Sequence, residues 1–247
     1  MRVTARSVAL LLVGLVAARG VVAAPSSLPP VEADGTTALH RAVYGGDVQE
    51  VRQLLAAGAD VKAANRFGAT ALQLAAVVGD PDMVGVLLKA GANPDSPNAE
   101  GQTALMAVAR TGNVESARLL LKAGANLQAH ERWGGQTALM WAAAQGQADM
   151  VRFLVSRGAK VNERSVVRDW QRRVTAEGRP KDMFRGGLTP LLFAVREGCV
   201  PCAQALLDAG ADVNLTDPDG VTPLILALLN VHWDTARFLV AHGADVN

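Results

Sequence analysis

The sequence predicts an all-α fold in which six helix-turn-helix repeats stack into a solenoid. A recurring anchor, Thr-Ala-Leu or Thr-Pro-Leu, begins at Thr37, Thr70, Thr103, Thr137, Thr189 and Thr222. Successive anchors lie 33, 33, 34, 52 and 33 residues apart. Each anchor opens two short helical patterns that are separated by a turn and followed by a glycine. A fixed period of this length indicates a repeat array in which each unit packs on its neighbours and the core grows lengthwise.

Each repeat is expected to be a helix pair followed by a projecting, hairpin-like loop. The anchoring threonine can cap the first helix, because its hydroxyl accepts a free backbone amide there. Pro190 and Pro223 follow two of the anchors, at a position where a missing N–H costs nothing. After the second helices come glycines suited to the left-handed conformation that ends many helices. These are Gly58, Gly91, Gly124, Gly158, Gly210 and Gly243.

The period of about 33 residues and its Thr-Pro-Leu opening resemble the ankyrin repeat family. The resemblance runs from about Glu32 to Asn247 and implies an ankyrin-repeat solenoid. The histidine that follows Thr-Pro-Leu in the family is present only as His40. The other five repeats carry Gln73, Met106, Met140, Leu192 and Ile225 there. This departure calls into question the family's imidazole-to-backbone link between those repeats, but not the fold.

The N-terminal 23 residues are expected to be a secretory signal peptide. Arg2 and Arg6 precede an apolar run over residues 8–18, and small residues suited to cleavage follow near Ala23. The run is shorter than the ~20 residues that span a bilayer, so a membrane anchor is the weaker alternative. Cleavage changes the net charge from +1 to −2, which gives no general attraction to nucleic acid or membranes. We therefore expect a periplasmic or secreted monomer.

The mature chain is expected to have four parts: a linker (24–33), repeats 1–4 (34–164), an inserted basic loop (165–187) and repeats 5–6 (188–247).

The inserted basic loop interrupts the period between the fourth and fifth repeats. It adds 19 residues to a period of 33 and has a local charge of +3, to which Arg172 and Arg173 contribute. Insertions in repeat proteins map to loops on one face, often the binding face. Three interpretations remain open: a solvated excursion, an arm that contacts a partner, and an anion site.

Cys199 and Cys202 are the chain's two cysteines, in the sequence Cys-Val-Pro-Cys. Alignment of the repeats places Cys199 at the start of a second helix, where the helix dipole favours a thiolate, and Cys202 in a half-exposed position. The alternatives are an inert disulfide or two ordinary thiols, a redox-active pair, and a metal site that lacks two further ligands. We expect no metal, no cofactor and no enzymatic activity, because no other catalytic motif is present.

What the resemblance implies is a protein-binding scaffold that uses its loop tips and the exposed face of its first helices as a concave surface. Carried over by position, the partner-binding residues are Tyr44, Arg66, Phe67, Glu100, Arg110, Arg132, Trp133, Gln145, Arg196 and Asp219, together with Arg172 and Arg173 of the insert. Arginine and aromatic side chains are enriched in interface hot spots, so Arg132 and Trp133 are expected to form the main contact. In the alternative, Phe67 or Trp133 folds back over a repeat junction. Trp141 and Phe193 are expected in the core.

The last repeat is as apolar as the internal ones, whereas terminal repeats usually carry a polar outer face. This pattern predicts a chain that continues past Asn247 or an end covered by a partner.

Three functions are consistent with the sequence. They are an exported module that binds an unidentified protein, a thiol-redox or stress-protection protein using Cys199 and Cys202, and a structural or regulatory segment of a larger protein.

Overall fold

A computed structural model describes residues 28–168 and 185–246, and within these ranges the regular structure is helical. Each repeat contributes one pair of helices. The pairs are α1 (Ala38–Tyr44) and α2 (Val48–Ala56), α3 (Ala71–Val78) and α4 (Pro81–Lys89), α5 (Ala104–Thr111) and α6 (Val114–Lys122), α7 (Ala138–Ala144) and α8 (Ala148–Ser156), α9 (Pro190–Arg196) and α10 (Val200–Asp208), and α11 (Pro223–Leu229) and α12 (Trp233–Ala241). The predicted solenoid of six helix pairs is confirmed.

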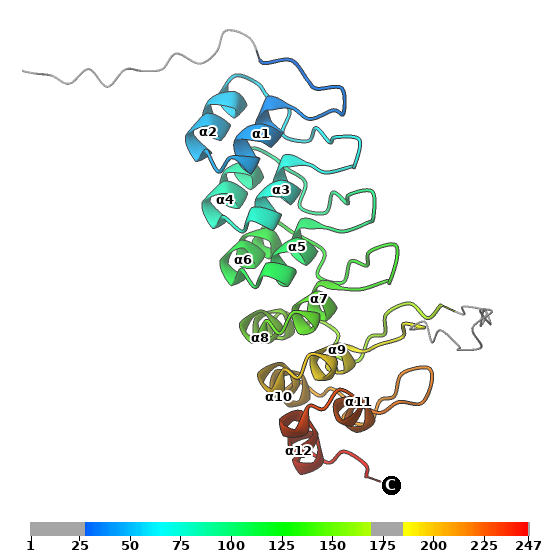
Figure 1. Ribbon diagram of the computed structural model, residues 1–247. Helices are drawn as coiled ribbons and strands as arrows, with labels where there is room; N and C mark the ends of the chain where they lie inside the picture. Colours follow the sequence, from blue (N-terminus) through cyan, green and yellow to red (C-terminus); the bar gives the residue numbers. More distant parts are fainter. Residues whose placement is uncertain (1–27, 169–184, 247) are drawn as a thin grey trace, which may run out of the picture.

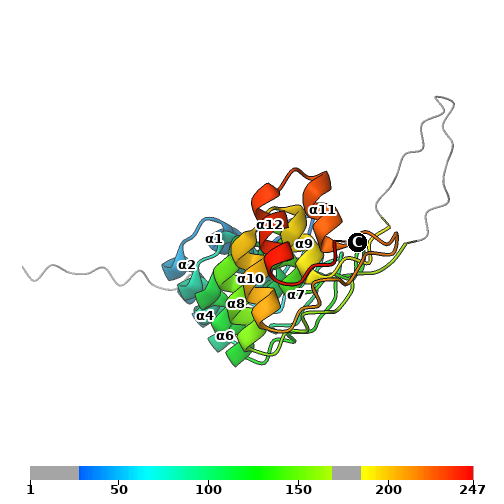
Figure 2. The same cartoon turned by 90° about the horizontal axis from the view of Figure 1, so that it is seen from below.

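The first helices of the pairs stack in one row and the second helices in another (Figure 1). Long loops project from the side of the first helices, and the view along the stack shows them gathered on that side (Figure 2). The first helices and the loops therefore share one face of the molecule, which we call the loop-side face. The second helices form the opposite face.

A layer of small and aliphatic side chains fills the space between the two rows. One leucine from each first helix and one from each second helix recur at the same position and are buried, for example Leu105 and Leu120 in repeat 3. Alanines such as Ala142 and Ala194 are fully buried between neighbouring first helices and allow their close approach. Burying one leucine side chain contributes about 1.5–3 kcal/mol relative to exposure, so stability is spread evenly along the stack.

Side chains at the start of the first helices join neighbouring repeats. The Thr37 hydroxyl caps α1, while Nδ1 of His40 accepts the Thr37 amide and Nε2 lies 3.1 Å from the Ala69 carbonyl oxygen of the next repeat. In repeat 2, Gln73 occupies the histidine position. Its Nε2 donates to the carbonyl oxygens of Ser96 and Gln102 at 2.8 and 2.9 Å. The imidazole link is thus absent in repeat 2, as its sequence indicates, and a glutamine amide makes a link to the next repeat's backbone instead.

The loop tips are tied together by backbone hydrogen bonds from one repeat to the next. The Arg66 amide donates to the Asp34 carbonyl oxygen at 2.8 Å, and the Ala99 amide to Phe67 at 2.9 Å. The same contact joins Arg132 to Glu100 in the following repeat, again at 2.9 Å. Each tip is therefore held in register by its neighbour, which makes the loops a continuous surface.

The last repeat leaves apolar side chains in solvent. Leu229 is 70% exposed and Trp233 61% exposed, and Ile225 and Leu228 are also exposed. The positions of Ile225 and Leu228 are buried in repeat 4, at Met140 and Ala143. That the chain continues past this end, or that a partner covers it, stays a prediction.

Among the described residues, no helix has the length and apolar character needed to cross a membrane.

The buried imidazole of His40 makes stability depend on pH. Burial lowers the pKa of His40 below the ordinary value, against the opposing effect of the Ala69 carbonyl. The unfolded chain therefore binds a proton more readily than the folded one, and stability is lost as the pH falls below about 6.5. We expect the free energy of unfolding to decrease between about pH 7.5 and about pH 5.5 in urea titrations.

The control for this effect is His40→Gln, which installs the side chain that repeat 2 uses for the same link. The variant is expected to show a weaker dependence on pH over that range, because a glutamine does not titrate. An unchanged pH dependence in His40→Gln would show that another group is responsible.

Candidate functional site

The loop before α7 is one residue longer than the equivalent loops of repeats 2 and 3, and Glu131 organises it. In the shorter loops, Asn65 and Asn98 each accept two backbone amides, from the residues two and four positions later. The buried Glu131 carboxylate instead accepts the amides of Trp133, Gly134 and Gln136, at 2.6 to 3.0 Å. Its side chain is one methylene longer, which matches the additional residue. The spacing of 34 residues between Thr103 and Thr137 shows the extra residue in the sequence, but not the glutamate that compensates for it.

Trp133 stands at the tip of this loop. Its side chain is 63% exposed, so the interpretation that it folds back over a junction is wrong. The Arg168 guanidinium lies 5.4 Å from the ring centroid, and the same side chain hydrogen-bonds to the Trp133 carbonyl oxygen. The preceding residue, Arg132, packs over Gly101 and donates to the Ala99 carbonyl oxygen at 3.2 Å. The exposed aromatic ring therefore has one arginine, Arg168, against it, while the Arg132 guanidinium bonds to the loop of repeat 3.

The base of the inserted loop lies against the same tip. The Val166 amide donates to the Gly134 carbonyl oxygen at 2.6 Å, and Val167 pairs antiparallel with Gly186. On the returning side, Arg185 forms an ion pair with Asp219 at 2.9 Å, which joins the insert to the loop of repeat 6. The insert thus leaves and re-enters the stack beside Trp133. Arg172 and Arg173 lie outside the described residues.

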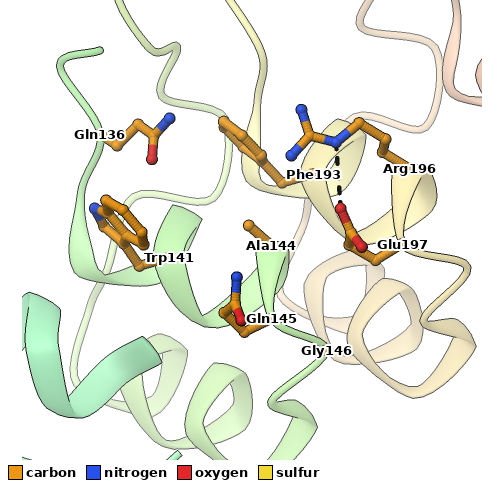
Figure 3. A pocket seen from close by; sticks show the side chains of 8 residues that line it. All are labelled: Gln136, Trp141, Ala144, Gln145, Gly146, Phe193, Arg196 and Glu197. Atoms are coloured by element: carbon orange, nitrogen blue, oxygen red, sulfur yellow. Dashed lines mark hydrogen bonds and ion pairs between the residues drawn. The ribbon is translucent and has the colours of Figure 1, made fainter. Parts of the chain in front are cut away.

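A pocket of about 480 Å³ lies next to this loop, between α7 and α9 on the loop-side face (Figure 3). We call it the repeat 4–5 pocket, and its lining residues are the eight labelled in Figure 3. Two of the predicted partner-binding residues, Gln145 and Arg196, meet there. Phe193 is buried as predicted, whereas Trp141 is only partly buried and forms one wall of the pocket. The expectation that Trp141 is a core residue holds only in part: the side chain packs against the core and its Nε1 is buried, but the residue is not fully covered.

The other predicted contact residues lie farther along the loop-side face. Phe67 is 55% exposed, with the Arg66 guanidinium 4.8 Å from its ring centroid, so it does not fold back either. Glu100 and Arg110 are exposed in repeat 3, at the loop tip and at the end of α5. Tyr44 is 78% exposed at the end of α1. These residues share a face with Trp133 but are not part of its cluster.

Cys199 and Cys202 form a disulfide at the start of α10. Cys199 is the N-cap residue, as predicted, and is partly buried. Cys202 is fully buried, so the expectation that it is half-exposed is wrong: its position faces the core between the helix rows. Among the described residues, no cluster of three or more His, Cys, Asp or Glu could hold a metal ion.

The paired helices, regular loops and loop-side pocket define a helical repeat protein with an extended surface for contacts. Comparison with known proteins agrees with this class. A family model described as "Ankyrin repeats (3 copies)" matches residues 8–98, 78–165 and 174–247. The chain therefore belongs to the ankyrin repeat family, whose repeats are generally protein–protein interaction domains.

Two solved structures are similar over most of the chain. An ankyrin repeat domain from Acinetobacter baumannii AYE is 28% identical, with a TM-score of 0.68, over 84% of this chain and 98% of that one. The ankyrin repeat domain of Bcl-3, a member of the IkappaB protein family, is 30% identical, with a TM-score of 0.68, over 86% and 88% of the two chains. Mouse protein phosphatase 1 regulatory subunit 27 is 41% identical over 24% of this chain and 38% of its own length. The chain spans between 5% and 38% of the length of its curated relatives.

The fit between Glu131 and its longer loop can be tested by changing the two together. Glu131→Asp shortens the side chain by one methylene, so the carboxylate should lose at least one of its three amide contacts. We expect the free energy of unfolding to fall by about 1–3 kcal/mol, the cost of leaving a buried donor unsatisfied, as measured by urea denaturation.

The compensating change is deletion of Gly135 in the Glu131→Asp background, which restores the loop length of repeats 2 and 3. We expect the double variant to recover part of the lost stability. An additive loss would show that the length of the side chain and the length of the loop are unrelated.

Proposed function

We propose that this chain is a non-enzymatic scaffold that binds a partner protein on its loop-side face, with its main contact at the junction of repeats 4 and 5. The observation that carries the proposal is the exposed Trp133, whose ring lies 5.4 Å from the Arg168 guanidinium at the tip of an ordered loop. Leaving so large an apolar ring in water is unfavourable, and Trp and Arg dominate the energetics of protein interfaces. The ring is also placed by a hydrogen-bonded loop, so little conformational entropy is lost on binding.

Several features support binding by the whole face rather than by one tip. The backbone bonds between tips hold Phe67, Glu100 and Trp133 at fixed spacing, which suits a partner that contacts several repeats. The ion pair between Arg185 and Asp219 extends this ordered surface past the insert to repeat 6. The known regulatory subunit among the relatives supports a regulatory role through binding.

We further propose that the mature protein acts outside the cytoplasm as a monomer. The basic and apolar pattern of residues 1–23 supports export. The Cys199–Cys202 disulfide supports the same conclusion, because disulfides persist mainly in oxidising compartments.

The test is a crosslinking pull-down from periplasmic and secreted fractions with the mature chain as bait. The double variant Arg132→Ala/Trp133→Ala should lose most of the recovered partner, because it removes the exposed ring and the arginine that precedes it in the loop tip. The control is Arg152→Ala/Arg157→Ala, which removes two exposed arginines from the second-helix side of repeat 4 and should leave partner recovery unchanged. Equal partner recovery by the wild type and the Arg132/Trp133 variant would refute the proposed contact.

A second candidate function is thiol–disulfide exchange, favoured by the position of the cysteine pair. Cys199 sits at a helix N-terminus and its sulfur accepts the Cys202 amide at 3.2 Å, which would stabilise a thiolate after reduction. In this reaction, one thiolate of a client dithiol attacks the accessible Cys199 sulfur and Cys202 leaves as a thiolate. The second client thiolate then displaces Cys199, so the client is oxidised to a disulfide and the pair is reduced.

Alkylation kinetics test this second candidate. After reduction, Cys199 should react with iodoacetamide at neutral pH about tenfold faster than an ordinary exposed cysteine, and the buried Cys202 should react slowly. The variant Cys202→Ser isolates the reactivity of Cys199. Ordinary thiol kinetics at Cys199 in both proteins would remove the redox function.

A further inference from the structure

A recurring contact joins the second helix of one repeat to the first helix of the preceding repeat. The side chain at the N-cap of the second helix lies within hydrogen-bonding distance of a backbone carbonyl oxygen at or just past the end of the preceding first helix. The contacts of this kind are Asn113 to Gly79, Gln147 to Arg110 and His232 to Arg196. We call this contact the N-cap link. It adds a side-chain bond between repeats to the backbone bonds that join the loop tips.

At the junction of repeats 4 and 5, the atom in this position is a cysteine sulfur. Cys199 is the N-cap residue of α10, and its sulfur lies 3.7 Å from the Gly146 carbonyl oxygen. Gly146 stands nine residues after the anchoring threonine of its repeat, as Gly79 does, so Cys199 is the counterpart of Asn113. A neutral thiol at this distance is a weak hydrogen-bond donor. The reduced cysteine can therefore complete the same link that Asn113 makes.

The disulfide removes that donor. Bonded to Cys202, the Cys199 sulfur carries no hydrogen, and the Gly146 carbonyl oxygen keeps only the Ala148 amide of its own repeat, at 3.0 Å. Repeat 2 shows an unlinked N-cap of the same kind. Asp80 accepts two amides of its own helix, and its carboxylate has no hydrogen to donate. The N-cap link at the junction of repeats 4 and 5 thus depends on the redox state of one cysteine pair.

The link lies where it can affect the proposed binding surface. Gly146 lines the repeat 4–5 pocket two residues past the end of α7, and Cys199 follows the end of α9 by three residues (Figure 3). These helix ends carry Gln145 and Arg196, two of the predicted contact residues. A bond between Gly146 and Cys199 fixes the two ends relative to each other, and a surface fixed in this way loses less conformational entropy on binding.

We propose that the Cys199–Cys202 disulfide is a redox switch of the junction between repeats 4 and 5. Reduction forms the hydrogen bond from the Cys199 thiol to the Gly146 carbonyl oxygen and tightens the binding of the partner. This inference rests on the proposed scaffold function and names its regulation.

The reductant is a dithiol. One of its thiolates attacks the partly buried Cys199 sulfur, and Cys202 leaves as a thiolate that takes up a proton. The second thiolate of the reductant then displaces Cys199, which is protonated to a thiol, and the reductant becomes a disulfide. The switch requires the neutral thiol at Cys199, whereas the exchange function described above uses the thiolate. The two are therefore alternatives.

The test is amide hydrogen exchange of the mature chain with and without dithiothreitol. The Gln147 amide shares a peptide group with the Gly146 carbonyl and bonds to the Ala142 oxygen at 3.0 Å, so its exchange reports directly on the link. Reduction should slow this exchange by about 2–10-fold, the effect of one net hydrogen bond. The Asn113 amide, at the same position of repeat 3, is the internal control and should not change.

Two double variants hold the junction in its two states. Cys199→Asn/Cys202→Ala installs the side chain that links repeats 2 and 3, and Cys199→Asp/Cys202→Ala installs the unlinked cap of repeat 2. The Gln147 amide should exchange about 2–10-fold more slowly in the Asn variant than in the Asp variant, and neither should respond to dithiothreitol. Both variants share Cys202→Ala, so a packing loss at that buried position is common to them.

Three results would overturn the inference. They are equal Gln147 exchange in the oxidised and reduced wild type, equal exchange in the two variants, and alkylation of reduced Cys199 at the rate of a thiolate. The last result counts against the link because a thiolate cannot donate a hydrogen bond.

The two variants, used as baits in the pull-down described above, distinguish the switch from the scaffold. If Gln147 exchange behaves as expected but the Asn and Asp baits recover equal amounts of partner, the link stands and its role as a switch is refuted. If the Asn bait recovers more partner while the Arg132/Trp133 variant loses none, the switch stands and the proposed main contact is refuted.

Discussion

The backbone hydrogen bonds between successive loop tips impose the constraint on which the binding surface depends. From repeat 2 to the base of the insert, each tip donates an amide to the carbonyl of the preceding tip, as Arg132 does to Glu100. A repeat with an inserted residue must therefore accommodate that residue within its own loop, so that the hydrogen bond to the preceding tip is kept. Repeat 4 absorbs an extra residue because the longer Glu131 side chain gathers the additional amides of its loop. The same loop presents Trp133 and places Gln136 at the pocket. One hydrogen-bonded loop therefore contributes both to the stability of the stack and to the proposed binding surface.

The junction of repeats 4 and 5 concentrates the features that set this chain apart from a regular array. The longer loop, the base of the insert, the repeat 4–5 pocket and the disulfide all lie within two repeats. Elsewhere the repeats are nearly interchangeable, and each contributes similar buried leucines. A repeat array tolerates such a local departure because each unit contacts only its neighbours. Any loss of packing stability at the irregular repeats therefore does not extend to distant repeats.

The fold could be predicted from the sequence because it follows from local chemistry repeated in register. The buried leucines and the left-handed glycines appear where the period places them, and the anchoring threonine hydroxyl caps the first helix in every repeat except the third, where Thr103 makes no cap hydrogen bond. The candidate site could be predicted only in part. Position along the repeat identified Gln145, Arg196 and the exposed Trp133, but not the burial of Cys202 or the partial exposure of Trp141. Those properties depend on how adjacent repeats pack around an irregular period. The hydrogen bonds of Glu131 to its loop could not be predicted from the repeat pattern either, because they depend on the match between the length of one side chain and the length of one loop.

Hydrogen exchange of the complex with its captured partner tests the central claim most directly. If the partner binds at the junction of repeats 4 and 5, amides of the loop over residues 131–136, the end of α7 and the end of α9 should gain protection, while α11 and α12 should not change. Protection confined to the second-helix row or to the exposed end at α11 and α12 would contradict the account.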